Sequence, residues 1–257
     1  MAISIELVQK GNRRYYSVTG DPSVEGLQLP SVTTIVNAVS GGGGGLAIWA
    51  ERLVIEWLTA RLTDELSQPG ADAKACVLDA LDKVKGIAGR QRDVAADKGT
   101  EIHRYAEQVL SGSMPEIPMQ YYQAISNMWG WFRTTGLDPR LGQSEKKVYS
   151  AISKYAGTID YRGVDDKGRI WIVDFKSGNN IYPKTAMQLA AYAAADEEMT
   201  GQPPYKAIAV KLSQEADGFE VKEADWRRAY EAFRYAKILY ETQNKLWLPS
   251  KKEKQDA

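Results

Sequence analysis

Two short stretches of sequence decide the fold: residues 156–160 are AGTID, and residues 173–178 are VDFKSG. The tetrapeptide DDKG between them is typical of a tight turn that joins two antiparallel strands. Because side chains alternate along a strand, Asp174 and Lys176 are expected on the same face. The hairpin is expected to bring Asp160 beside Asp174. The sequence therefore predicts two carboxylates and one ammonium group at one place.

These three side chains have two interpretations. Carboxylate oxygens are the ligands that Mg²⁺ and Mn²⁺ prefer, so the group is a candidate metal centre. An aspartate and a lysine two residues apart on a strand also occur as an ordinary solvated ion pair. The choice between the two depends on what accompanies them upstream and downstream.

Upstream, residues 98–107 are KGTEIHRYAE, and the apolar positions that follow have helical spacing. Thr100 is expected to cap the N-terminus of this helix, which places His103 in its first turn and Glu107 one turn later on the same face. His103 is the only histidine of the chain. Beside the two aspartates it would make a mixed nitrogen and oxygen site that suits Mn²⁺. The alternative is a surface histidine at a helix start.

Downstream, an alanine-rich helix is predicted to begin at Pro183, because proline suits the first helical position. Lys184, Gln188 and Tyr192 are four residues apart and form one polar stripe along it. The small alanine side chains would let the helix lie close to the sheet. The alternative is an ordinary solvated helix face.

In this order the motifs resemble those of the PD-(D/E)XK nuclease superfamily, and in particular its RecB-like branch. The matching patterns are G-T-x-x-H, G-x-I-D, D-x-K and Q-x-x-x-Y, and all four are intact. Residues 14–35 also resemble the opening of phage-encoded exonucleases and of the mitochondrial genome maintenance exonuclease. The resemblance covers most of residues 14–195.

The resemblance implies an α/β fold, with a restriction-endonuclease-like core of a mixed β-sheet flanked by helices and a helical N-terminal elaboration. Residues 1–257 are expected to form a single nuclease domain. Its expected parts are N-terminal strands and a turn (1–36), a helical elaboration that carries His103 (46–137), a catalytic α/β core (144–222), a C-terminal helix (224–246) and a disordered tail (250–257).

The resemblance also implies roles for individual residues. Catalysis is assigned to Asp160, Asp174 and Lys176, and the metal ligands to His103, Asp160, Asp174 and the backbone carbonyl of Phe175. Contacts with nucleic acid are expected from Gln188, Tyr192, Lys184 and Arg104. Glu145 and Glu107 are second-tier candidates near the metal.

By the same resemblance, the expected activity is Mg²⁺- or Mn²⁺-dependent hydrolysis of DNA. An exonuclease that acts on single strands or free ends in replication or recombination is favoured. It is expected to be encoded by a phage or prophage and to work in the host cytoplasm. Its expected partners are DNA and other replication or recombination proteins. Three alternatives stay open: an endonuclease of the same superfamily, a catalytically silent DNA-binding protein, and an unrelated α/β protein. In the last case His103 would not cluster with the two aspartates.

Composition sets limits on these expectations. The chain has 257 residues, 44% hydrophobic and 26% charged, with a formal net charge of zero. A nucleic-acid enzyme of this composition must concentrate positive charge locally. The single cysteine, Cys76, excludes an iron–sulfur cluster and a disulfide framework and fits a reducing compartment. Residues 41–45 are all glycine, without the lysine of a phosphate loop, and are expected to be a flexible linkage. Neither a signal peptide nor a membrane-spanning segment is expected.

Overall fold

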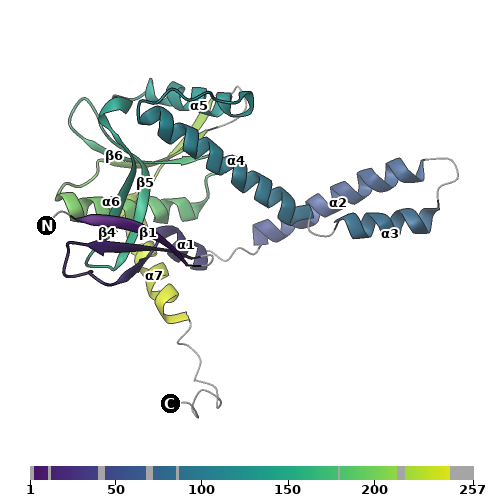
Figure 1. Ribbon diagram of the computed structural model, residues 1–257, viewed down its shortest axis with the longest axis horizontal. Helices are drawn as coiled ribbons and strands as arrows, with labels where there is room; N and C mark the ends of the chain where they lie inside the picture. The colour runs from purple at the N-terminus through teal and green to yellow at the C-terminus, as the bar shows by residue number, and fades with distance from the viewer. Residues whose placement is uncertain are drawn as a thin grey trace, which may run out of the picture. The chain divides into compact units, whose positions relative to one another are not determined.

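The protein is described from a computed structural model, in which residues 3–10, 13–39, 44–67, 72–84, 87–178, 180–212 and 218–243 are defined. The chain separates into two compact units, Met1–Ser40 with Ile102–Ala257, and Gly41–Glu101. Figure 1 labels the elements of both. The expected turn at residues 11–12, the glycines at 41–43 and the predicted tail at 250–257 lie outside the described residues.

The unit formed by Gly41–Glu101 is helical. It contains α2 (Gly44–Leu66), α3 (Ala73–Val84) and the first part of α4 (Ile87–Leu110). Helices α2 and α3 lie side by side (Figure 1), and Arg61 of α2 approaches Asp79 of α3 at 3.8 Å. Both partners of this ion pair are half exposed, so it contributes little to stability.

The larger unit opens with a small antiparallel sheet of three strands in the order β1-β2-β3. Its strands are Ser4–Lys10, Arg13–Thr19 and Gln28–Pro30, and helix α1 (Val32–Val39) follows directly. The hydroxyl of Ser31 caps α1 by accepting a hydrogen bond from the Thr34 N–H at 3.0 Å. A parallel bridge between Ser31 and Ala156 joins this segment to the main sheet.

The main sheet has five strands in the order β4-β5-β6-β7-β8. These strands are Gln143–Ser150, Tyr155–Val164, Ile170–Lys176, Lys206–Leu212 and Phe219–Glu223. Neighbours pair antiparallel except β6 and β7, which are parallel. A parallel pair needs a crossover, and α6 (Pro183–Thr200) provides it. The predicted DDKG turn joins β5 and β6, with Gly168 in the left-handed region at φ 75°.

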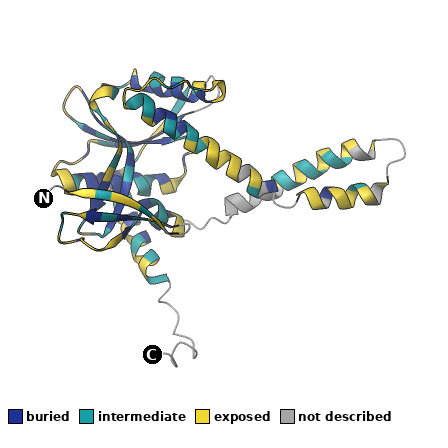
Figure 2. Ribbon diagram, in the orientation of Figure 1, coloured by how far each residue is buried: buried dark blue, intermediate teal, exposed yellow. Residues whose placement is uncertain are grey.

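Helices cover both faces of this sheet (Figure 1). Helices α1, α6 and α7 (Trp226–Thr242) cover one face and bury a core that includes Val148, Ile159, Ile170, Ile172, Ala207 and Ala209. The end of α4 and α5 (Met119–Phe132) cover the other face, against Tyr161, Val173, Phe175, Ile208, Val210 and Leu212. In Figure 2 the central strands and the inner side of α6 are accordingly buried. Alternation along β6 therefore gives one apolar face toward α5 and leaves Asp174 and Lys176 on the α6 side.

The predicted start of the histidine helix is wrong. Helix α4 runs without interruption from Ile87 to Leu110, so Thr100 is in its interior and donates its hydroxyl proton to the Ala96 carbonyl at 3.0 Å. His103 is consequently in the last third of a long helix and not in a first turn. A glycine inside a helix costs only about 1 kcal/mol, which neighbouring helix formers offset, so Gly99 does not end the helix here.

The architecture confirms the predicted fold class, a mixed α/β fold with a five-stranded sheet flanked by helices and a helical N-terminal elaboration. Helix α6 begins at Pro183, as the sequence predicts. In the described part of the chain, every helix is too short or too polar to cross a membrane.

Candidate active site

The candidate site is built where β4 and β5 lose their regular pairing. Ser144 pairs with Tyr161 and Lys146 with Ile159, so Glu145 lies opposite Asp160 between two regular rungs. Glu145 has a φ of 50°, a backbone conformation that costs a residue with a side chain about 1–3 kcal/mol. Such strained residues concentrate at functional sites.

Both strands change face at this rung. Before it, Ser144 faces α4, where its hydroxyl lies 3.4 Å from that of Ser111. After it, Lys146 faces α6 and bonds Asp196. On β5, Ile159 belongs to the core under α6, whereas Tyr161 belongs to the core under α5. Because the pairing is interrupted here, Glu145 and Asp160 do not follow the regular alternation of side chains. Neither side chain therefore has to point into one of the two hydrophobic cores.

Asp174 is the most deeply buried charged group of the site, with no exposed surface. One carboxylate oxygen, Oδ1, accepts a hydrogen bond from Gln188 Nε2 at 2.9 Å. The other, Oδ2, lies 2.7 Å from Lys176 Nζ, at an angle that does not make a hydrogen bond. The Lys176 ammonium is therefore the one close polar partner that the described residues give to this buried oxygen.

Asp160 receives its contacts from two other elements. Its Oδ2 accepts a hydrogen bond from the Phe175 N–H at 2.8 Å, which ties β5 to β6 at the point where their regular pairing ends. His103 Nδ1 of α4 lies 3.5 Å from the same oxygen. The structure thus brings together His103, Asp160, Asp174 and Lys176, the four residues that the sequence placed at one centre.

The polar stripe of α6 reaches this centre through Gln188 and Tyr192. Gln188 donates to the Tyr192 hydroxyl at 3.1 Å and accepts from Lys176 Nζ at 3.3 Å, in addition to its bond with Asp174. Tyr192 is buried, and a Cβ added at Gly157 would overlap its ring. Gly157 is therefore required so that β5 can approach Tyr192. Lys184 is exposed and donates to Asn37 of α1 at 3.3 Å.

Burial and neighbouring charges raise the pKa values of the acidic residues of the site. Burial raises the pKa of Asp174 to about 6, the negative charge of Asp160 adds to this, and the ammonium of Lys176 opposes it. Glu145 is exposed as a residue, yet partial desolvation and the charges of Asp160 and Glu107 raise its pKa to about 7. Burial lowers the pKa of Lys176, but its two aspartate neighbours raise it overall. The carboxylates of the site thus repel one another, and a bound cation would reduce this repulsion.

The remaining predicted residues surround this centre. Glu107 is exposed on α4, close enough to Glu145 for its charge to be felt there. The guanidinium of Arg104 lies over the ring of Tyr105, 4.1 Å from its centroid, and its Nη1 lies 3.3 Å from Gln108 Oε1. The roles proposed for these residues stay predictions.

Sequence reasoning missed Asp196, which is fully buried on α6. Its carboxylate binds Lys146 Nζ at 2.5 Å and Arg162 Nε at 2.9 Å. Lys146 lies just after the strained Glu145, and Arg162 lies two residues after Asp160, so this one carboxylate holds both strands beside the irregular rung. The stripe of Lys184, Gln188 and Tyr192, extended by one more step of four residues, leads to Asp196 and was the signal that could have found it.

The sequence matches no known family model and no curated protein. Several solved structures are distantly similar in fold, including the following two. A candidate exonuclease from Eubacterium rectale is 10% identical over 56% of this chain and 65% of its own, with a TM-score of 0.40. The protein SSO0001 is 14% identical over 73% of this chain and 86% of its own, with a TM-score of 0.35. The match spans slightly less than two thirds of the first of these proteins.

Proposed function

We propose that this chain is a divalent-metal-dependent nuclease that hydrolyses phosphodiester bonds of DNA, and that it acts as an exonuclease on single strands or free ends. The observation that carries the proposal is one cluster drawn from four elements. Asp174 and Lys176 of β6 and Gln188 of α6 are joined by short polar contacts. Asp160 of β5 accepts a hydrogen bond from the Phe175 N–H between them, and His103 of α4 lies beside Asp160.

The donor set suits a hard divalent cation. His103 lies beside Asp160, the charges of both act on Asp174, and Oδ2 of Asp174 has the Lys176 ammonium as its close partner. Carboxylate and imidazole groups are ligands that Mn²⁺ accepts. Among the residues that the structure describes, no three His, Cys, Asp or Glu side chains already converge as a finished metal site. Metal binding therefore requires the ammonium of Lys176 to move away from Asp174, with the Phe175 carbonyl as a proposed further ligand.

The side chains of the chain have distinct proposed roles. When bound, a divalent cation supplies Lewis-acid chemistry, polarising the phosphate and acidifying a water molecule. Lys176 orients that water and offsets negative charge that develops on the phosphate. Gln188 fixes the Asp174 carboxylate through Oδ1 and leaves Oδ2 available. Tyr192 holds Gln188 in this orientation, because its hydroxyl accepts the second hydrogen bond of that amide.

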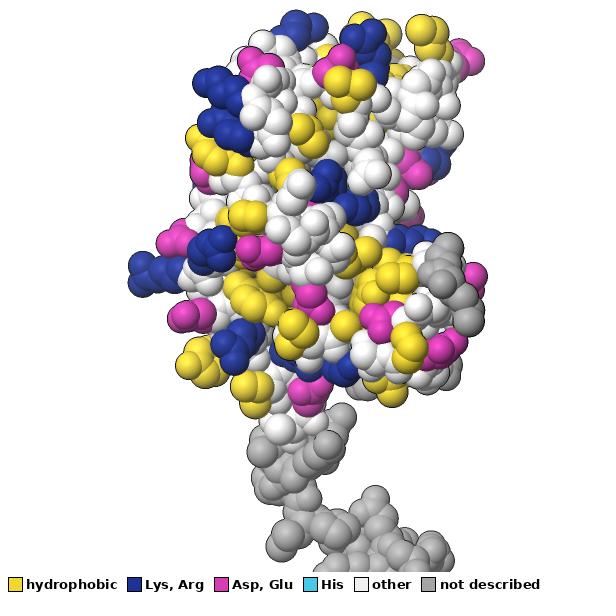
Figure 3. Space-filling model, turned by 90° about the vertical axis from the view of Figure 1, so that its left-hand side faces the viewer, with side chains coloured by type: hydrophobic (Ala, Val, Ile, Leu, Met, Phe, Trp, Pro, Cys, Tyr) yellow, Lys and Arg dark blue, Asp and Glu magenta, His cyan; other side chains and the backbone are white. Residues whose placement is uncertain are grey.

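A polyanionic substrate must be attracted locally, because the net charge of the chain is zero. On the face shown in Figure 3, basic and acidic side chains lie next to one another and do not form one continuous basic surface. We therefore expect individual cationic side chains beside the carboxylate centre, and not a broad basic surface, to attract the DNA.

The test is purified protein against end-labelled linear and circular single-stranded DNA of the same sequence, with Mg²⁺, Mn²⁺ or EDTA. We expect metal-dependent loss of the linear strand only, since a circle offers no end. Cutting of the circle would show an endonuclease instead. Absence of cutting with every metal, together with tight DNA binding, would support a catalytically silent binding protein and overturn the proposal.

If Mn²⁺ binds at this centre, it should raise the melting temperature of the protein. Mn²⁺ at about one hundred times its dissociation constant should stabilise the folded state by about 2.7 kcal/mol and raise the melting temperature by several degrees. Asp160→Asn should lose this increment and His103→Ala should need more Mn²⁺ to reach it. Asp166→Asn is the matched control, because Asp166 is exposed in the turn between the same two strands and should keep the full shift. An unchanged shift in Asp160→Asn would place the metal elsewhere.

A further inference from the structure

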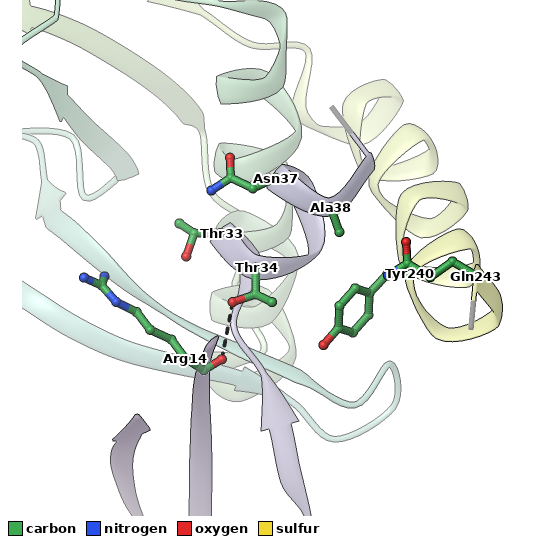
Figure 4. A pocket seen from close by; sticks show the side chains of 7 residues that line it. All are labelled: Arg14, Thr33, Thr34, Asn37, Ala38, Tyr240 and Gln243. Atoms are coloured by element: carbon green, nitrogen blue, oxygen red, sulfur yellow. Dashed lines mark hydrogen bonds between the residues drawn. The ribbon is translucent and has the colours of Figure 1, made fainter. Parts of the chain in front are cut away.

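A pocket of about 530 Å³ lies on the α1 side of the larger unit, outside the carboxylate cluster. Figure 4 shows its two walls. Arg14 of β2 with Thr33, Thr34 and Asn37 of α1 form one, and Tyr240 of α7 with Gln243 forms the other. A volume of this size suits a small organic ligand such as one nucleotide.

The charge of the pocket favours an anion. Arg14 is exposed, and its guanidinium makes no hydrogen bond or ion pair with any residue in the described part of the chain. No carboxylate is among the described residues that line the pocket. The Thr34 hydroxyl bonds the Arg14 carbonyl at 3.4 Å (Figure 4), so α1 and β2 are held together at this wall. A guanidinium with free donors is well suited to a phosphate.

Two connections lead from the pocket to the carboxylate centre. The charge of Arg14 opposes the raised pKa of Glu145, which places the guanidinium within electrostatic reach of the irregular rung. On the other side, Asn37 accepts a hydrogen bond from Lys184, the first member of the stripe that continues to Gln188. The pocket therefore lies beside the beginning of the α6 stripe that leads to Gln188.

The opposite wall offers an aromatic surface. Tyr240 is partly buried against the core under α6. In Figure 4 its ring extends from α7 toward the beginning of α1, and the Arg14 side chain extends away from it toward the other end of the pocket. Aromatic rings on which bases stack are typical of proteins that bind single strands, and the interaction tolerates any base. A nucleotide with its phosphate on Arg14 and its base against Tyr240 would contact both walls of the pocket.

We propose that this pocket binds one nucleotide of a single-stranded DNA substrate, next to the bond that is cut, with its phosphate on Arg14 and its base or sugar against Tyr240. The inference rests on the proposed nuclease function for the identity of the ligand. It adds a substrate subsite that is separate from the carboxylate centre and that fixes the strand relative to it.

The test measures binding and not cleavage, so that it does not depend on catalysis. A fluorescein-labelled single-stranded oligonucleotide is titrated with the Asp174→Ala protein in EDTA at several salt concentrations, and Arg14→Ala is added to that background. We expect the affinity to fall about three- to tenfold, and the slope of log affinity against log salt to become shallower by about 0.7, the value for one phosphate contact on a single strand. Arg14→Lys should restore the slope.

The matched control is Arg133→Ala, which removes an exposed arginine at the end of α5, on the other face of the sheet. Equal affinity and equal slope in the Arg14 and Arg133 variants would overturn the inference, even if the wild-type protein cleaves DNA. A changed slope only in the Arg14 variant would support the subsite, even if the wild-type protein cleaves nothing and the proposed function fails. If the parent Asp174→Ala protein does not bind the oligonucleotide, the subsite is overturned, whereas the proposed function stands or falls with cleavage by the wild-type protein.

Discussion

Replacing Asp174 by alanine is expected to lower DNA cleavage by about 10³-fold or more, because preorganised charge-stabilising groups contribute about 10²–10³-fold each and this carboxylate also holds Lys176. The affinity for DNA should stay within about threefold, since the contacts that position a strand lie on its phosphates away from the reacting bond. Rates under single-turnover conditions and affinities in EDTA measure the two effects separately.

Lys176→Ala should lose cleavage to a similar extent while keeping metal binding, because its ammonium acts on water and on developing charge and not as a ligand. Asp166→Ala and Lys167→Ala are the matched controls, as both residues are exposed in the turn that joins the same strands. Near-normal cleavage by Lys176→Ala would show that the role given to this lysine is wrong.

Proton binding by Asp174 should also make the stability of the fold depend on pH. In metal-free buffer, burial raises the pKa of Asp174 from 3.8 to about 6, so the folded state binds this proton more tightly than the unfolded chain does. The stability that this gives is present below pH 4 and is lost as the pH rises from about 4 to about 6. Asp174→Asn cannot ionise. We therefore expect its free energy of unfolding to fall less than that of the wild type over this window.

The sequence predicts much of the core because the relevant signals are local. The DDKG turn sets the hairpin, and alternation along β6 separates Val173 and Phe175 from Asp174 and Lys176. A period of four along α6 places Gln188 and Tyr192 on the face that meets Asp174. Each of these signals involves residues close together in the chain, whose geometry is fixed by strand or helix periodicity.

The parts that sequence reasoning misses depend on contacts between distant segments. The left-handed backbone of Glu145 contradicts its local preference, and it persists because both flanking strands are held by Asp196 of α6. Periodicity alone places Glu145 and Asp160 on regular strand faces, whereas both strands change face at this rung. Arg14 comes to the site only because the small sheet docks on β5, where the Tyr16 hydroxyl lies 2.8 Å from that of Thr158.

Asp196 should carry the largest effect on stability. It has no exposed surface, and its two cationic partners, Lys146 and Arg162, keep only 17% and 12% of their side-chain surface. Removing one partner of a buried charge network leaves the others unpaired, which costs about 3–5 kcal/mol. Asp196→Ala is therefore expected to lower the melting temperature by on the order of 10 °C. Lys83→Ala, which breaks a half-exposed pair with Asp79 one helical turn away, should change the free energy of unfolding by no more than about 0.5 kcal/mol.

Asp196 should also matter for the chemistry, because its partners lie on either side of the rung formed by Glu145 and Asp160. Asp196→Asn keeps the shape and one acceptor, so it should fold at moderate temperature while holding the two strands less firmly. We expect its single-turnover cleavage rate to fall at a temperature where the protein is fully folded, with DNA affinity in EDTA unchanged. A normal rate in a destabilised Asp196→Asn protein would mean that this carboxylate stabilises the fold without positioning Asp160. A lowered rate restored by raising the Mn²⁺ concentration would show that the strands act through the placement of a metal ligand.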